Sequence, residues 1–164
     1  MPTVTPVHHA YIALGSNLGL SADALEGAVA EIAALPETQV QQISPWYRSA
    51  AIGGPSNQPD YLNAVCAIDT ALEPRPLLQA LHQIEHHFGR ERQVRWAPRT
   101  LDLDIIWFDN LTSPDPGLTL PHPRAHERAF VVRPLADIAP DLVLQGQPLS
   151  HWLKQTSDQA ITRW

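Results

Sequence analysis

Residues 101–108 read LDLDIIWF, a run in which leucine and aspartate alternate over the first four positions. Alternate residues of a β-strand face opposite sides of a sheet, so Leu101 and Leu103 are expected to face a core. Asp102 and Asp104 then share the other face, about 6.6 Å apart. The stretch therefore predicts a strand that is buried on one face and carries two carboxylates on the other.

This strand is the last of the six elements that the clearest sequence patterns predict. Apolar residues at alternate or helical spacing predict the order strand, helix, strand, strand, helix, strand. Their expected ranges are 10–15, 21–35, 40–48, 61–71, 74–89 and 101–108. This order is the split βαβ arrangement of the ferredoxin-like fold, an α+β sandwich in which helices pack on a mainly antiparallel sheet. We expect both helices on one face, which leaves the other face and its rim for function.

Beyond residue 108 the sequence patterns are weaker. We expect a loop that enters a short helix at 121–128, a helix at 130–138 and a last helix at 149–154. The chain has 164 residues, a length typical of one domain. We therefore expect a single domain over 1–164, with residues 1–9 as a flexible N-terminus.

The cysteine count and the hydropathy pattern bear on the compartment. The chain has one cysteine, Cys66, so it can form no intramolecular disulfide, and apolar neighbours predict that this thiol is buried. No apolar run reaches about 18 residues, and the start of the chain lacks the pattern of a signal peptide. We expect a cytoplasmic protein, a monomer, with no membrane partner.

The charges are unevenly distributed. Lys and Arg number 11 against 17 Asp and Glu, and the net charge of -6 argues against a protein that coats nucleic acid. Four arginines nevertheless fall within residues 90–99. The planar guanidinium group pairs with phosphate oxygens, so this segment favours a phosphate-binding loop. On composition alone, a solvated charged loop is an equally good interpretation.

Two carboxylates on one side of a strand repel each other unless a cation lies between them. Mg²⁺ prefers oxygen ligands and completes its shell with water and substrate phosphates, so Asp102 and Asp104 are candidate ligands of two Mg²⁺ ions. The alternative is a pair of acids that face solvent. The arginines directly upstream favour the metal site, because cations and metal ligands together suit a polyphosphate.

Four motifs carry a family resemblance. The run RWAPRTLDLDI at 95–105 resembles the signature of the 6-hydroxymethyl-7,8-dihydropterin pyrophosphokinases, enzymes of folate biosynthesis. Three other motifs agree in order, namely ALGSN at 13–17, QPDYLNA at 58–64, and PHP at 121–123 followed by ERAF at 127–130. The resemblance covers about residues 10–140 and also implies a ferredoxin-like fold.

The resemblance implies transfer of pyrophosphate from ATP to the hydroxymethyl group of the reduced pterin, with release of AMP. Asp102 and Asp104 match the ligands of the two Mg²⁺ ions. Phosphate contacts are implied for Arg92, Arg95 and Arg99, and the loop over 89–98 can act as a lid. The residues expected to act directly in catalysis are Arg95, Arg99, Asp102 and Asp104.

The same resemblance implies the binding residues of both substrates. For the pterin, Tyr61 and Phe130 match two rings that sandwich the heterocycle, and Asn63 offers an amide to its edge. Further pterin contacts are expected from Ser49, Ala50, Ile52, Gly53 and Trp96. ATP contacts are expected from Glu85, Arg92, Arg95, Trp96, Arg99, Ile105, Thr119, His122 and Arg128.

The sequence departs from the family pattern in two places. Ala97 stands where the family usually has Gly, and 49–51 read SAA where Thr and Pro are more frequent. Two alternatives stay open. The aspartates could serve another two-metal phosphotransferase or nucleotidyltransferase, and a ferredoxin-like sheet could bind RNA without catalysis. The pairs His82 with His86 and His122 with His126 have the spacing of Zn²⁺ ligands but no convincing third ligand, so we interpret them as a solvated helix face and a nucleotide contact.

Overall fold

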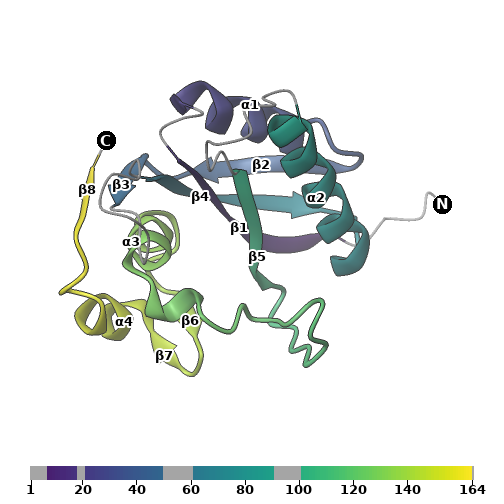
Figure 1. Ribbon diagram of the computed structural model, residues 1–164. Coiled ribbons are helices and arrows are strands. Elements are labelled where there is room, and N and C mark those ends of the chain that lie inside the picture. The colour runs from purple at the N-terminus through teal and green to yellow at the C-terminus, as the bar shows by residue number, and fades with distance from the viewer. Residues whose placement is uncertain (1–6, 18–20, 50–60, 91–100, 164) are drawn as a thin grey trace.

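The structure is a computed structural model that describes residues 7–17, 21–49, 61–90 and 101–163. A sheet runs through the centre of the molecule, with helices on both of its faces (Figure 1). The elements are β1 (His8–Asn17), α1 (Ser21–Ala33), β2 (Thr38–Ile43), β3 (Tyr47–Ser49), β4 (Tyr61–Thr70), α2 (Pro74–Arg90), β5 (Leu101–Phe108), the 3₁₀ helix η1 (Ala125–Glu127), α3 (Ala129–Ile138), β6 (Val143–Leu144), β7 (Gln147–Pro148), α4 (Leu149–Gln155) and β8 (Ile161–Arg163).

The described strands form a six-stranded sheet in the order β5-β1-β4-β3-β8, and β2 also pairs with β4. Every pairing in this sheet is antiparallel. The predicted order strand, helix, strand, strand, helix, strand is confirmed except that the strand expected at 40–48 is divided into β2 and β3, and β5 occupies the range expected for the aspartate-bearing strand. The architecture is the ferredoxin-like α+β sandwich that this order predicts.

One predicted strand is two strands. The expected strand at 40–48 is interrupted between β2 and β3 at Ser44, Pro45 and Trp46. Proline has no N–H to donate to a neighbouring strand. The backbone N–H of Val65 is instead satisfied by the Oγ atom of Ser44, at 2.9 Å. The interruption therefore does not leave the backbone N–H of Val65 without a hydrogen-bond acceptor.

The prediction that one face of the sheet is open was also wrong. On one face, Ile12 and Leu14 pack with α1 and α2 in a single buried cluster. On the other face, Ala13, Val65 and Ile106 pack against the buried side of α3. The apolar side of α3 is formed by Val131, Val132 and Leu135. The sheet is therefore covered on both faces, and a functional site must lie beside α3 and not on a bare sheet.

The C-terminal third differs more from the sequence expectations than the rest. The expected short helix within 121–128, the helix at 130–138 and the last helix correspond to η1, α3 and α4. The hairpin of β6 and β7, and the strand β8 beside β3, were not predicted. Strands of two or three residues carry too few positions for an alternating pattern to stand out.

The structure also bears on the expectations for the N-terminal segment and for Cys66. The expected flexible segment 1–9 is too long, because His8 and His9 are part of β1 and are paired with Thr70 and Asp69 of β4. Cys66 is buried as predicted, and burial raises the pKa of its thiol to about 12. In the part of the chain that the structure describes, no helix is long and apolar enough to cross a membrane.

Candidate active site

The register of three strand pairs brings distant polar residues onto one face of the sheet. Asp102 of β5 lies opposite Gly15 of β1, and Gly15 lies opposite Asn63 of β4. Asn63 in turn lies opposite Tyr47 of β3. Directly opposed residues of antiparallel strands present their side chains on the same face. The carboxylate of Asp102 and the amide of Asn63 therefore share a face, with only a glycine between them.

The glycine in this row leaves little space for a larger residue. A Cβ atom at position 15 would lie 3.3 Å from the Oδ1 atom of Asn63, closer than ordinary van der Waals contact. Asn63 itself is buried, and its Nδ2 atom donates a 2.8 Å hydrogen bond to the Oγ atom of Ser49. The bond fixes the amide, so that Oδ1 remains on the side of Gly15.

These residues form the floor of a hollow of about 380 Å³. Its walls come from the start of α3, through Arg128 and Phe130, and from the beginning of β4, through Tyr61. The guanidinium carbon of Arg128 lies 5.7 Å from the centre of the Phe130 ring, a cation–π distance. Other residues that line this hollow are Ala13, Leu14, Gly15, Ser49, Asn63, Asp102, Asp104, Ile106, His122, Ala125 and Val131.

A second hollow, of about 260 Å³, adjoins the first. It is lined by Leu78, His82, Ile105, Pro116, Gly117, Leu118, Thr119 and Pro123. Asp104 and His122 line both hollows. The site can therefore hold two molecules side by side, with a carboxylate and an imidazole at the boundary between them.

The loop at the second hollow is shaped by an aspartate turn. The Oδ1 atom of Asp115 accepts a 2.9 Å hydrogen bond from the N–H of Gly117, and its backbone oxygen accepts one of 2.9 Å from Thr119 Oγ1. Asp115 is also paired with Arg75 of α2. Pro116, Gly117 and Leu118, which line the second hollow beside Thr119, were not predicted from the sequence. The sequence Asp-Pro-Gly at 115–117 is a turn signal that could have indicated this loop.

The acidic side chains in and beside the hollows interact with one another. The pKa of Asp102 is raised by burial of its carboxylate among protein atoms and by the charge of Asp104, and the charge of Arg128 acts in the opposite direction. Burial likewise raises the pKa of Glu85 on α2. The Oε2 atom of Glu85 accepts a 2.8 Å hydrogen bond from the backbone N–H of Leu103. Glu85 thus supports β5 from behind and lines neither hollow.

The imidazole of His122 is held in place by backbone groups. The backbone N–H of His122 donates to the backbone oxygen of Ile106 at 3.0 Å, and the Nδ1 atom of the ring accepts from the backbone N–H of Arg124 at 3.2 Å. Burial lowers the pKa of this ring, an effect that the charge of Asp104 opposes. Because Nδ1 acts as an acceptor, the neutral ring carries its proton on Nε2.

The donor set fits a cation that prefers oxygen. Asp102 and Asp104 supply carboxylate oxygens from one face of β5, and both line the first hollow. Among the residues that the structure describes, no group of three or more His, Cys, Asp or Glu side chains could hold a metal ion. A cation bound by these two aspartates must therefore complete its shell with water or phosphate, which is how Mg²⁺ is usually held.

The predicted site residues fall into four groups, one of which is Glu85 alone, a predicted ATP contact that lines neither hollow. Eight line the first hollow, namely Ser49, Tyr61, Asn63, Asp102, Asp104, His122, Arg128 and Phe130. Ile105 and Thr119 line the second. The predictions for Ala50, Ile52, Gly53, Arg92, Arg95, Trp96 and Arg99, and the departure at Ala97, lie outside the described residues.

Comparison with known proteins agrees with this geometry. Residues 11–140 match the family described as 7,8-dihydro-6-hydroxymethylpterin-pyrophosphokinase (HPPK). The chain belongs to this family. It is therefore an enzyme, a pyrophosphokinase of folate synthesis.

Relatives of similar length support the assignment to the HPPK family. A protein of Synechocystis sp. named 2-amino-4-hydroxy-6-hydroxymethyldihydropteridine pyrophosphokinase is 47% identical over 156 residues, which cover 94% of this chain and 79% of the relative. A protein of the same name from Pseudomonas aeruginosa is 44% identical over 158 residues, which cover 96% of this chain and 97% of the relative.

Solved structures show the HPPK fold at low sequence identity. A Plasmodium falciparum HPPK-DHPS triple mutant has a TM-score of 0.73 and 13% identity, and covers 92% of this chain. The match spans 44% of the Plasmodium chain, which is therefore more than twice as long as the matched part. At this identity the likeness bears on the fold alone.

Proposed function

We propose that this chain transfers the pyrophosphoryl group of ATP to the hydroxymethyl group of 6-hydroxymethyl-7,8-dihydropterin, with two Mg²⁺ ions as cofactors. The observation that carries the proposal is the junction of two hollows at Asp104 and His122. Two substrates bound side by side, with phosphates at the acidic boundary, are what a transfer between them requires.

The first hollow suits the pterin. The rings of Tyr61 and Phe130 both line it, and a flat heterocycle gains about 1–3 kcal/mol from stacking on an aromatic side chain. The Oδ1 atom of Asn63 is available to accept a hydrogen bond from the edge of the pterin, because the Nδ2 atom of the same amide is engaged by Ser49. The hollow thus offers stacking surface and an oriented acceptor.

The second hollow suits the nucleoside part of ATP. Apolar side chains of Leu78, Ile105 and Leu118 surround it, and Thr119 adds a hydroxyl group. We assign the base to this hollow and the triphosphate to the boundary. There the guanidinium group of Arg128, which lines the first hollow, can pair with phosphate oxygens.

Asp102 and Asp104 are the residues that would hold the Mg²⁺ ions. When bound, the ions would neutralise charge on the triphosphate and on the leaving oxygen. In the reaction the pterin hydroxyl oxygen forms a bond to the β-phosphorus, the bond from that phosphorus to the oxygen bridging it to the α-phosphate breaks, and AMP leaves with that oxygen. The proton of the hydroxyl group is released to water, so that the products are the pterin diphosphate, AMP and one proton.

The residues of the chain act mainly by positioning. We propose that Glu85 supports the two aspartates through its hydrogen bond to the N–H of Leu103. The family resemblance adds Arg92, Arg95, Trp96 and Arg99 as a phosphate-binding lid that excludes water, and this assignment remains a prediction. Ala50, Ile52 and Gly53 likewise remain predicted pterin contacts.

Product analysis tests the proposal. The protein is mixed with ATP, Mg²⁺ and 6-hydroxymethyl-7,8-dihydropterin, and nucleotides and pterins are separated by chromatography. AMP and the pterin diphosphate should form in equal amounts, and omission of the pterin or of Mg²⁺ should abolish both. Formation of ADP would indicate a simple kinase, and release of free pyrophosphate a nucleotidyltransferase. Either result would contradict the proposal.

We further propose that residues 1–164 act as one domain and as a monomer. The described residues that line the two hollows come from the strands of one sheet, from α2 and α3 and from the segment before α3, which supports the assignment to one domain. Light scattering coupled to size-exclusion chromatography should give the mass of one chain. A stable dimer would contradict this assignment.

A further inference from the structure

The start of α3 forms a wall of the first hollow, yet it lacks an ordinary helix cap. Arg128 is the N-cap residue of α3, and its side chain makes no capping hydrogen bond. The first backbone N–H groups of a helix have no partner within the helix, and short polar side chains usually satisfy one of them. An arginine whose guanidinium group faces a binding site cannot do this, so another part of the chain must.

Gln159 supplies the missing partner from 30 residues away. Its Oε1 atom accepts a 2.8 Å hydrogen bond from the N–H of Ala129, the first residue of α3. Its Nε2 atom donates a 2.8 Å hydrogen bond to the backbone oxygen of Glu127. The two bonds fall on either side of Arg128. One side-chain amide therefore clamps the backbone that carries both Arg128 and, one residue further, Phe130.

Gln159 is itself held by its neighbours. Its backbone N–H donates to the backbone oxygen of Thr156 at 3.0 Å. Thr156 is buried, and its Oγ1 atom donates to the backbone oxygen of Trp152 in α4 at 2.8 Å. The position of the amide is thus set by the end of α4 and not by a free chain end.

The same segment reaches a second wall of the hollow. Two residues after Gln159, strand β8 pairs with β3, so that Ile161 lies opposite Ser49. Ser49 lines the hollow and accepts the hydrogen bond of Asn63. Residues 156–163 therefore connect the α3 wall with the β3 wall. None of the motifs in the sequence pointed to this segment.

We propose that Gln159 is a positioning residue for the pterin site, which acts through the backbone of Glu127 and Ala129 to hold Arg128 and Phe130 in their places. The inference rests on the proposed function of the first hollow. Glutamine suits the task because its amide offers one acceptor and one donor, which match one N–H and one C=O group. It also leaves the guanidinium group of Arg128 free to lie over the Phe130 ring.

The test compares Gln159→Met with Gln155→Met. Methionine resembles glutamine in shape but forms neither hydrogen bond, and Gln155 is an exposed glutamine at the end of α4 that serves as the matched control. For Gln159→Met we expect the KM for the pterin to rise about tenfold, as the loss of one or two net hydrogen bonds predicts, while kcat falls less than about threefold. Gln155→Met should leave both constants unchanged.

A second variant keeps the test decisive if Gln159→Met folds poorly. Gln159→Glu retains the acceptor for Ala129 and loses the donor for Glu127, so its KM should lie between those of wild type and Gln159→Met. If the variants lose thermal stability but keep the wild-type KM for the pterin, Gln159 has only a structural role and the proposal is wrong. A loss confined to kcat would overturn it as well.

A readout without activity separates this inference from the proposed function. Exchange of the Ala129 amide proton, followed by NMR in the full chain, should be faster in Gln159→Met than in wild type and unchanged in Gln155→Met. Unchanged exchange at Ala129 would overturn the clamp itself. If instead wild type forms no AMP with the pterin, the proposed function fails, and the pterin role of Gln159 with it, whatever the exchange rates are.

Discussion

The Oε2 atom of Glu85 and the backbone N–H of Leu103 are joined by a 2.8 Å hydrogen bond between α2 and β5. Leu103 is the residue between the two aspartates, and β5 stands at one end of the strand order of the sheet. A strand in that position has backbone groups without a strand partner on one side. Glu85 satisfies one of them and so helps to fix the strand that carries Asp102 and Asp104.

Replacement of Glu85 tests this support. Glu85→Ala leaves the N–H of Leu103 without its partner, and we expect a loss of about 1–2 kcal/mol in the free energy of unfolding, measured by urea denaturation. Glu85→Gln keeps an oxygen acceptor and should lose less than half of that. Gln83→Ala, on the exposed side of α2, is the control and should be neutral. Equal losses for the Ala and Gln variants would show that the hydrogen bond is not the cause.

Gly15→Ala tests the row from Asp102 to Asn63. The added Cβ would lie 3.3 Å from the Oδ1 atom of Asn63, so the amide must move by a few tenths of an ångström. We expect the KM for the pterin to rise about fivefold, which corresponds to the net value of about one hydrogen bond, with a change in Tm of only a few degrees. The KM for ATP serves as the internal control, because Gly15 lines only the first hollow. An unchanged pterin KM would remove Asn63 from the pterin site.

The sequence predicted the parts of this site that depend on local patterns. The alternation of leucine and aspartate in β5 is visible in four consecutive residues, so the two carboxylates could be placed on one face. The helices α1 and α2 were predicted for the same reason, because helical spacing is local. The family resemblance then indicated Tyr61, Asn63 and Phe130, and these do line the first hollow.

Other features depend on pairing between distant residues, which no local pattern records. The strand predicted at 40–48 divides at Pro45. There the side chain of Ser44 accepts a hydrogen bond from the backbone N–H of Val65 in β4. The position of α3 against Ala13 and Ile106 follows from its apolar side, but the sequence did not say which face of the sheet it would cover. Gln159 lies in a polar stretch of sequence. Only its hydrogen bonds to the backbone of Glu127 and Ala129 distinguish it from the polar residues around it.

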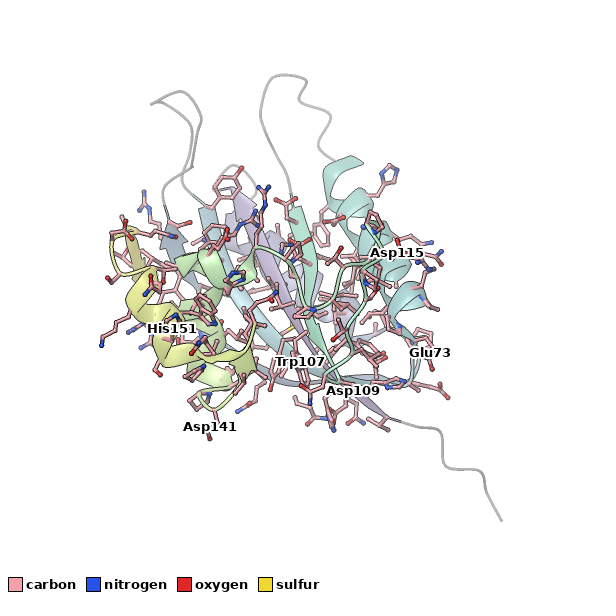
Figure 2. The ribbon with its side chains drawn as sticks, turned by 90° about the horizontal axis from the view of Figure 1, so that it is seen from below. Glu73, Trp107, Asp109, Asp115, Asp141 and His151 are labelled. Carbon is pink, nitrogen blue, oxygen red and sulfur yellow. The ribbon has the colours of Figure 1, made fainter. Side chains whose placement is uncertain are left out.

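The aspartates themselves are tested by Asp102→Asn and Asp104→Asn. Each removes a charge that would help to hold Mg²⁺ with no change in size, so the fold should persist while kcat falls about a thousandfold or more, as the loss of several kcal/mol of charge stabilisation predicts. Asp141→Asn, on an exposed loop after α3, is the matched control (Figure 2). Turnover like that of wild type in both site variants would remove the metal assignment.

At the opposite end of β5, a histidine and an aspartate give stability a dependence on pH. Asp109 and Glu73 lie close together there (Figure 2). His8 contacts both, through Nδ1 to Asp109 at 2.6 Å and through Nε2 to Glu73 at 3.4 Å. Burial tends to lower the pKa of His8, but hydrogen bonds to Asp109 and Glu73 outweigh it and raise the pKa above 6.5. Burial tends to raise the pKa of Asp109, but hydrogen bonds from His9 and His8 outweigh it and lower the pKa below 3.8.

The two shifts predict opposite limits of stability. The contribution of His8 is complete below pH 6.5 and is lost as pH rises through the raised pKa, whereas that of Asp109 is complete above pH 3.8 and is lost as pH falls through the lowered pKa. The interaction between His8 and Asp109 therefore stabilises the fold most between pH 3.8 and pH 6.5. The Tm of wild type minus that of His8→Gln, measured from pH 5 to pH 8.5, should decrease as pH rises. Gln83→Ala, which removes no titratable group, serves as the control and should give a difference that does not change with pH. A constant difference for His8→Gln would show that its charge contributes nothing to stability.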